Sequence, residues 1–146
     1  MITVPFKREH LDKLDIRYPE LIGMDLDRAY EEIPKYADAG PAFSLFTEKW
    51  LLIAIFGLGI IWEGVGLGWV LPSIYVDDYK LSFHRFIKAY LRLMTEANHL
   101  HRVQCYVHVD YAVSQKWVER LGFHVEGLLE KFGQDKSDYF LYARVE

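Results

Sequence analysis

One stretch of the sequence, residues 50–76, constrains the fold more than any other. It contains no lysine or arginine, and Glu63 is its only acidic residue. A membrane-spanning helix needs about 20 apolar residues, so the length alone permits one. Five glycines within twelve positions oppose a helix, since each costs up to about 1 kcal/mol relative to alanine, and Glu63 would place a charge near the bilayer centre. The pattern favours two buried β-strands, over residues 50–61 and 66–72.

The rest of the composition indicates a globular domain. Hydrophobic residues make up 51% of the 146 residues and aromatic residues 16%, which excludes a disordered chain and predicts one domain over residues 1–146. The net charge of −4 argues against a nucleic-acid-binding protein. Cys105 is the only cysteine, and residues 1–14 lack the apolar segment of a secretory signal. We therefore expect a cytoplasmic protein that binds neither nucleic acid nor a membrane.

Hydrophobic periodicity predicts alternating strands and helices along the chain. Strands are expected over residues 2–6, 42–47, 50–61, 66–72 and 102–109, helices over 7–15, 25–36, 81–100 and 111–121, and a terminal hairpin over 123–132 and 138–145. This order predicts a mixed α/β domain with a central sheet flanked by helices.

The last third of the chain carries a short motif in a specific context. Residues 117–123 read WVERLGF at the end of a predicted helix, and Glu126-Gly127 and residues 138–144 follow in the terminal hairpin. In this position the motif resembles the GCN5-related N-acetyltransferase (GNAT) superfamily, in which a helix ending in Leu-Gly-Phe leads into the sixth strand. The chain is most similar to small phage-encoded GNAT-like proteins of the T7-type internal virion protein kind. The resemblance implies a GNAT-like (acyl-CoA N-acyltransferase) fold.

The resemblance also implies a site for acetyl-CoA as co-substrate. The pantetheine would lie along residues 69–73, with Val70, Leu71 and Ser73 as candidate contacts, and the pyrophosphate would meet the N-terminus of the next helix. The candidate phosphate-binding side chains are Lys80, Ser82, His84, Arg85 and Lys88.

The segment that would bind the pyrophosphate departs from the family pattern. Residues 77–84 contain no glycine, whereas the family uses a glycine-rich loop there. Asp77 and Asp78 would repel phosphates unless they point away. Alternatively, these acids cap the helix and the basic residues form a solvated face.

The catalytic groups are also unusual for this superfamily. The strand at residues 66–72 has no carboxylate, so the candidate bases are Glu63, in the preceding turn, and His108, at the carboxyl end of a strand. Histidine suits proton transfer near neutral pH, but His108 could equally be a half-buried strand residue and Glu63 a plain turn residue. Tyr111 is the candidate general acid, because the position where the family often has a tyrosine falls at Trp117-Val118.

Two functions from different classes remain open. One is an N-acetyltransferase that transfers acetyl to a primary amine of an unidentified acceptor. The other is a catalytically degenerate GNAT-fold protein that acts in phage virions or morphogenesis through contacts with phage structural proteins, in the host cytoplasm or in the virion. We expect no metal site, since His99 and His101 lack further ligands at a suitable spacing. The sequence leaves the oligomeric state open.

Overall fold

The chain folds around one seven-stranded sheet with the strand order β1-β2-β3-β4-β5-β7-β6. The structure is a computed structural model that describes residues 1–146, apart from the side chains of Glu20 and Leu21. The strands are β1 (Ile2–Pro5), β2 (Ala42–Phe46), β3 (Leu52–Trp62), β4 (Val65–Pro72), β5 (Arg102–His108), β6 (His124–Leu129) and β7 (Tyr139–Val145). The helices are α1 (Pro19–Ile22), α2 (Leu26–Asp38), α3 (Lys80–Ala97) and α4 (Ala112–Arg120), with 3-10 helices η1 (Arg8–Lys13) and η2 (Ile74–Tyr79).

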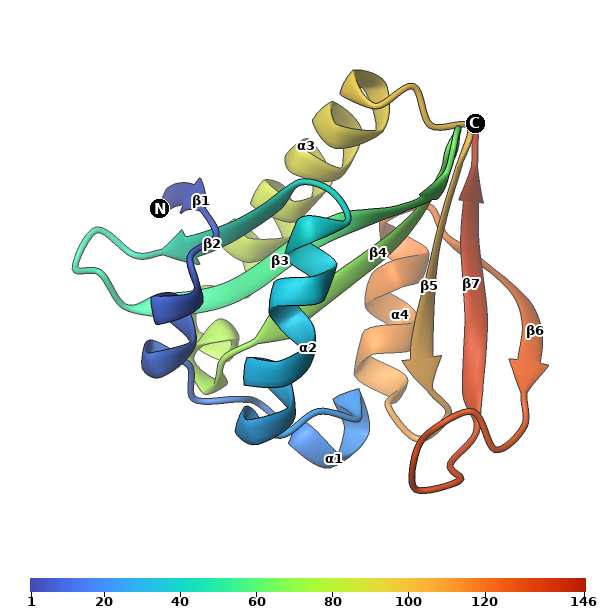
Figure 1. Ribbon diagram of the computed structural model, residues 1–146, viewed down its shortest axis with the longest axis horizontal. Coiled ribbons are helices and arrows are strands. Elements are labelled where there is room, and N and C mark those ends of the chain that lie inside the picture. Colours follow the sequence, from blue (N-terminus) through green and yellow to red (C-terminus); the bar gives the residue numbers. More distant parts are fainter.

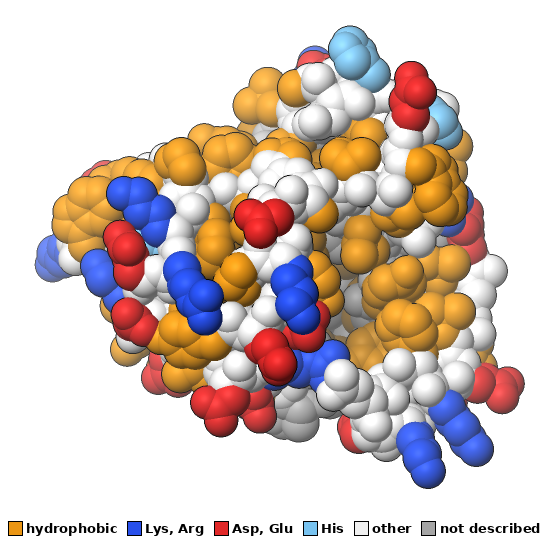
Figure 2. All heavy atoms as spheres, viewed as in Figure 1, with side chains coloured by type: hydrophobic (Ala, Val, Ile, Leu, Met, Phe, Trp, Pro, Cys, Tyr) orange, Lys and Arg blue, Asp and Glu red, His pale blue; other side chains and the backbone are white. Residues whose placement is uncertain are grey.

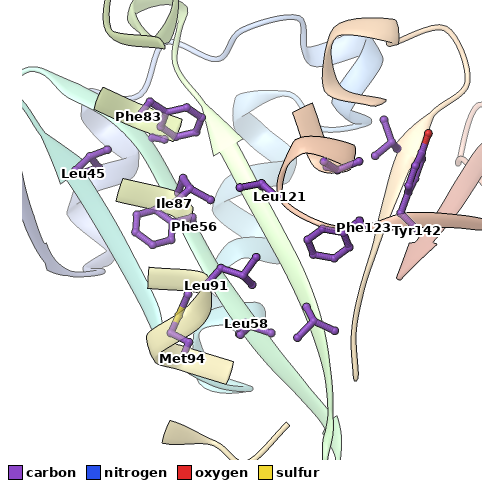
Figure 3. Packing of buried hydrophobic residues seen from close by; sticks show 14 of the residues in the cluster. Leu45, Phe56, Leu58, Phe83, Ile87, Leu91, Met94, Leu121, Phe123 and Tyr142 are labelled. Atoms are coloured by element: carbon purple, nitrogen blue, oxygen red, sulfur yellow. The ribbon is translucent and has the colours of Figure 1, made fainter. Parts of the chain in front are cut away.

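Helices cover both faces of the sheet (Figure 1), which confirms the predicted mixed α/β class. Adjacent strand residues point to opposite faces, so Leu45 packs with α3 and α4 while Phe46 packs with η1 and α2. The larger of the two cores lies beneath α3, where Phe83, Ile87 and Leu91 meet the sheet (Figure 3).

The apolar stretch at residues 50–76 forms the expected buried hairpin. β3 and β4 pair antiparallel, and nearly every side chain of β3 from Leu52 to Leu58 is shielded from solvent. The turn contains Gly64, whose φ of 84° suits glycine. None of the helices in the described part of the chain is long and apolar enough to cross a membrane.

Two segments differ from the sequence prediction. The expected helix over residues 7–15 is the shorter 3-10 helix η1, and α1 was not predicted. The expected strand over 123–132 ends at Leu129, because Lys131 adopts a positive φ of 53° and its N–H bonds to the Asp138 carboxylate. The β6–β7 connection is therefore a longer loop than predicted.

The pairing of β4 with β5 determines where a site can form. The two parallel strands pair only where Val65–Leu67 meets Arg102–Gln104. Beyond this point the strands separate (Figure 1), while β5 remains paired with β7 along its whole length. The far half of β4 therefore has a free edge.

Candidate functional site

The separation of β4 and β5 opens a cleft of about 1560 Å³. Its walls come from β4 and β5, from one side of each of α2, α3 and α4, and from the β6–β7 loop. Figure 2 shows the hollow on one face, with hydrophobic side chains on the strand side and charged side chains on the side of α2. Ends of parallel strands that diverge in this way are typical ligand sites.

The free edge of β4 presents main-chain groups to the cleft. The Ser73 N–H donates to the Ile53 carbonyl of β3 at 2.9 Å, and backbone groups alternate in direction along an antiparallel strand. Val70 therefore directs its N–H and C=O away from β3, toward the cleft. On the same edge, the Pro72 carbonyl already accepts from the Arg17 N–H at 3.0 Å.

The predicted pantetheine contacts differ in their placement. Val70 and Leu71 line the cleft. Ser73 is fully buried, and its hydroxyl donates to the Leu52 carbonyl at 2.8 Å and accepts from the Tyr75 N–H at 3.2 Å. The structure therefore gives Ser73 a local structural role in starting η2.

Of the two acids before α3, Asp77 does not act as a free negative charge, whereas Asp78 is exposed and has no ion pair among the described residues. Asp77 pairs with Arg17 at 3.0 Å and with Lys80 at 3.6 Å, so two cations surround its carboxylate. Within the described residues, no side chain caps the first turn of α3. The N–H groups of its first turn therefore lack a side-chain partner, and the positive end of the helix dipole favours an anion there.

Helices α3 and α4 both contribute basic side chains to the cleft. Of the predicted phosphate contacts, Lys80 and His84 line the cleft, and the lining found among the described residues does not include Ser82, Arg85 or Lys88. Lys116 and Arg120 of α4, which were not among the predicted contacts, also line it. Their four-residue spacing, directly before the Leu-Gly-Phe motif, is the signal that could have identified them.

His84 is held in place from α4. The Trp117 indole N–H donates to His84 Nδ1 at 3.2 Å. Burial lowers the pKa of His84, and the nearby charges of Lys88 and Arg120 lower it further. His84 is therefore favoured in its neutral form, and the positive charge on this side of the cleft comes from lysine and arginine.

Tyr111 occupies the start of α4 and is almost completely buried. Arg17 Nη1 donates to its hydroxyl oxygen at 2.9 Å, and the same guanidinium pairs with Asp77. Burial raises the pKa of Tyr111, and the positive charge of Arg17 opposes this effect. Because the oxygen accepts this bond, the phenolic proton remains available for donation. The sequence analysis missed Arg17, which lies in a polar segment without periodicity.

His108 lies at the end of β5, buried against the ring of Tyr139 at 5.2 Å between centroids. Its Nδ1 accepts the Asp110 backbone N–H at 3.0 Å. An amide N–H can only donate, so the neutral ring carries its proton on Nε2. In this tautomer the Nε2 of His108 is a hydrogen-bond donor, and the neutral ring has no free lone pair to act as a base.

Glu63 lies apart from these groups. Glu63 is exposed in the turn between β3 and β4. This turn leads into the amino end of β4, whereas the free edge belongs to the carboxyl half of the strand. Among the described residues that line the cleft, His108 and Tyr111 are present and Glu63 is not. The structure thus brings together two of the three predicted catalytic residues.

Neither a reactive thiol nor a cluster of metal ligands accompanies these groups. Burial raises the pKa of Cys105 to about 12, so its thiol stays protonated near neutral pH. In the part of the chain that the structure describes, there is no group of three or more His, Cys, Asp or Glu side chains suited to a metal ion.

Comparisons with known proteins identify the fold. No protein-family model matches the sequence, and no curated protein sequence matches it significantly. A variant of spermidine N-acetyltransferase SpeG from Vibrio cholerae superimposes with a TM-score of 0.72 at 15% identity, over 99% of this chain and 95% of that chain. A putative phosphinothricin N-acetyltransferase reaches 0.77 at 11% identity, over 99% and 97%. A GNAT-family acetyltransferase from Bacillus anthracis reaches 0.76 at 14% identity, over 98% and 93%. The chain therefore has the GNAT acyl-CoA N-acyltransferase fold.

Proposed function

We propose that this protein is an acetyl-CoA-dependent N-acetyltransferase that acts on a primary amine. The observation that carries the proposal is the cleft between β4 and β5, whose free main-chain edge leads to the uncapped first turn of α3. The proteins of similar structure are acetyltransferases by name, which supports the same activity.

The residues present fit acetyl-CoA without a glycine-rich loop. The Val70 main chain offers one donor and one acceptor to the amides of the pantetheine, as an added strand would. The first turn of α3 and the side chains of Lys80, Lys116 and Arg120 offer positive potential to the phosphates. Side-chain cations thus take the place of the glycine-loop amides.

Tyr111 is the proposed general acid. The amine nitrogen attacks the thioester carbonyl, the carbon–sulfur bond breaks, and the departing thiolate takes the phenolic proton of Tyr111. The Arg17 guanidinium, already bonded to the phenolic oxygen, stabilises the phenolate that remains. The phenolate regains a proton from water, and the extra proton on the attacking nitrogen is released to water as the amide forms.

His108 acts as a donor in this proposal. With its proton on Nε2, it can donate a hydrogen bond to the reacting groups but cannot deprotonate the amine. The proposal gives no role to Glu63, which lies in an exposed turn. The amine therefore enters as the neutral fraction present at the working pH.

The test combines binding and turnover. Calorimetry with acetyl-CoA should show saturable binding, and thiol release should follow addition of an amine acceptor. The Tyr111→Phe variant should lose about 100-fold in kcat with little change in acetyl-CoA affinity. Tyr90→Phe is the matched control, because Tyr90 packs against Phe43 and Phe56 and is not among the described residues that line the cleft. No heat of binding at high micromolar acetyl-CoA would refute the proposal.

The second candidate is a non-catalytic GNAT-fold protein of a phage virion or its assembly. Two departures from the family pattern favour this candidate: residues 77–84 contain no glycine, and β4 contains no carboxylate. The first affects phosphate binding and the second affects catalysis, and a non-catalytic protein needs neither. Co-purification with assembled particles, together with no acetyl-CoA binding, would support this alternative. Tight, saturable acetyl-CoA binding would remove its main support.

A further inference from the structure

The half of the cleft between α2 and the β6–β7 loop has aromatic walls. We call this half the acceptor chamber and define it by Tyr36, Trp69, Tyr106, Phe132 and Tyr139, all of which line the cleft. Their rings form two groups, with Tyr36 at 5.8 Å from Trp69 on one side, and Phe132 at 4.7 Å from Tyr106 and 5.6 Å from Tyr139 on the other. Such walls favour a ligand with an apolar or aromatic body.

The connection between α1 and α2 lies against the floor of the chamber. A side chain placed at Gly23 would stand 2.6 Å from the Tyr139 hydroxyl. This close approach brings the first turn of α2 next to the start of β7. The residues at the start of α2 are therefore positioned to contact whatever occupies the acceptor chamber.

Arg28 is the cation that α2 contributes to the cleft. Its backbone N–H is bonded to the Asp25 carboxylate at 2.9 Å, which fixes the first turn of the helix. The side chain is half-buried and lines the cleft. Burial raises the pKa of Tyr36 and of Tyr139, and the positive charge of Arg28 opposes this effect at both. Arg28 therefore lies at the edge of the acceptor chamber.

Arg28 lacks a counter-charge within the described part of the chain. None of the ion pairs there involves it, although Glu31 is three residues further along the same helix. Its Nε is buried and has no hydrogen-bond partner among the described groups. A half-buried guanidinium without an anion is unfavourable, so the site is complementary to a ligand that supplies one.

The acidic residues of the cleft are less available to a cationic ligand. Asp25 caps α2, Asp77 pairs with two cations, and Asp135 accepts hydrogen bonds from the N–H and hydroxyl of Ser137. Asp27 and Glu31 are solvent-exposed, where water and salt screen their charges. Arg28 is less exposed than Asp27 and Glu31, so its charge is screened less, and it has no ion pair among the described residues.

We infer that the acceptor amine carries a carboxylate that pairs with Arg28, next to an apolar or aromatic body that fills the acceptor chamber. The inference rests on the proposed acetyltransferase function and specifies its substrate class as small apolar amino acids. A planar carboxylate can accept two parallel hydrogen bonds from the guanidinium. A polyamine offers only donors and would meet Arg28 with like charge.

The experiment compares acceptors that differ only in the carboxylate. The pairs are phenylalanine with phenethylamine and leucine with isopentylamine, assayed by thiol release at saturating acetyl-CoA. The amino acid of each pair should have a kcat/KM higher by about tenfold or more, as expected for one charge-assisted bond. In Arg28→Gln this advantage should disappear, because kcat/KM for the amino acids falls by about tenfold or more while kcat/KM for the decarboxylated amines does not fall. Arg8→Gln is the matched control, since Arg8 is exposed on η1.

The outcomes separate this inference from the proposed function. Failure to bind acetyl-CoA would refute the acetyltransferase function itself. Acetyl-CoA binding with an equal or greater kcat/KM for the decarboxylated amines would overturn only the carboxylate inference, and so would turnover of neither member of any pair. An Arg28→Gln variant that binds acetyl-CoA normally but slows both members of each pair equally would also overturn it.

Discussion

Arg17 connects three elements at the open end of the cleft, and replacing it with methionine tests what these contacts contribute to stability. The Arg17→Met variant keeps an unbranched apolar stem but loses the charge and the side-chain donors. The lost contacts are the ion pair with Asp77 at 3.0 Å, the hydrogen bond to Tyr111 at 2.9 Å, and the position of the guanidinium 4.9 Å from the centre of the Tyr18 ring. The backbone bond to Pro72 remains.

The expected loss follows from the exposure of the partners. The Arg17 side chain is 14% exposed and Asp77 39%, so their pair lies between a surface and a buried ion pair and contributes about 1 kcal/mol. The bond to Tyr111 contributes about 1 kcal/mol and the cation–π contact about 0.5 kcal/mol. The free energy of unfolding should therefore fall by about 2–3 kcal/mol, which corresponds to a decrease in Tm of about 5–10 °C.

The assay is urea unfolding followed by tryptophan fluorescence, with Arg8→Met as the control. Arg8 is exposed, so the control should change the free energy of unfolding by less than about 0.5 kcal/mol. A double-mutant cycle with Tyr111→Phe should give a coupling of about 1 kcal/mol. A loss below about 0.5 kcal/mol in Arg17→Met, or zero coupling with Tyr111, would refute the reasoning.

Three further predictions concern other parts of the fold. Burial raises the pKa of Cys105 to about 12. Its thiol should therefore resist alkylation by iodoacetamide at pH 8 in the folded protein and react once urea unfolds the chain. Equal alkylation rates in the two states would contradict this prediction. Gly40→Ala should destabilise the fold by about 2 kcal/mol or more, because the new Cβ would stand 1.9 Å from the Leu58 carbonyl oxygen. Gly127→Ala is the control in the same urea titration, and it should lower stability little because open space surrounds Gly127. Burial lowers the pKa of His10, so the unfolded chain binds its proton first and stability should fall as the pH drops below about 6.5. His10→Gln should flatten that decline, and an unchanged pH profile would contradict the prediction.

The segments with the clearest periodicity were predicted most accurately. The helix expected over residues 81–100 is α3, Lys80–Ala97, and the strand expected over 102–109 is β5, Arg102–His108. Both patterns are periodic repeats of apolar residues that arise because one face of the element is buried. Such a repeat is visible in residues that are close together in the sequence. The boundaries differ by at most three residues, because only the end residues depend on contacts beyond the element.

The N-terminal segment was predicted less well for the opposite reason. Residues 7–24 show no periodicity, and their conformation depends on contacts made far along the chain. The Arg17 side chain bonds to Tyr111 across a sequence separation of 94 residues, and the His10 ring contacts the Ser44 hydroxyl across 34. Local patterns carry no information about such partners, so neither Arg17 nor Arg28 was identified as a cleft residue.

The same principle changes the interpretation of the start of α3. In the sequence, Asp77 next to a helix without glycine suggests repulsion of phosphate, because its neighbours in the chain are the only partners in view. In the structure, Arg17 and Lys80 surround its carboxylate. A phosphate of CoA arriving there would compete with Asp77 for these two cations, and would gain the open N–H groups of α3 in addition. The net effect of Asp77 on acetyl-CoA binding is therefore a difference between two interaction free energies. One is that of the phosphate with these two cations, and the other is that of the Asp77 carboxylate with the same cations. This difference is smaller than the repulsion between an isolated carboxylate and a phosphate, so the missing glycines alone do not exclude acetyl-CoA.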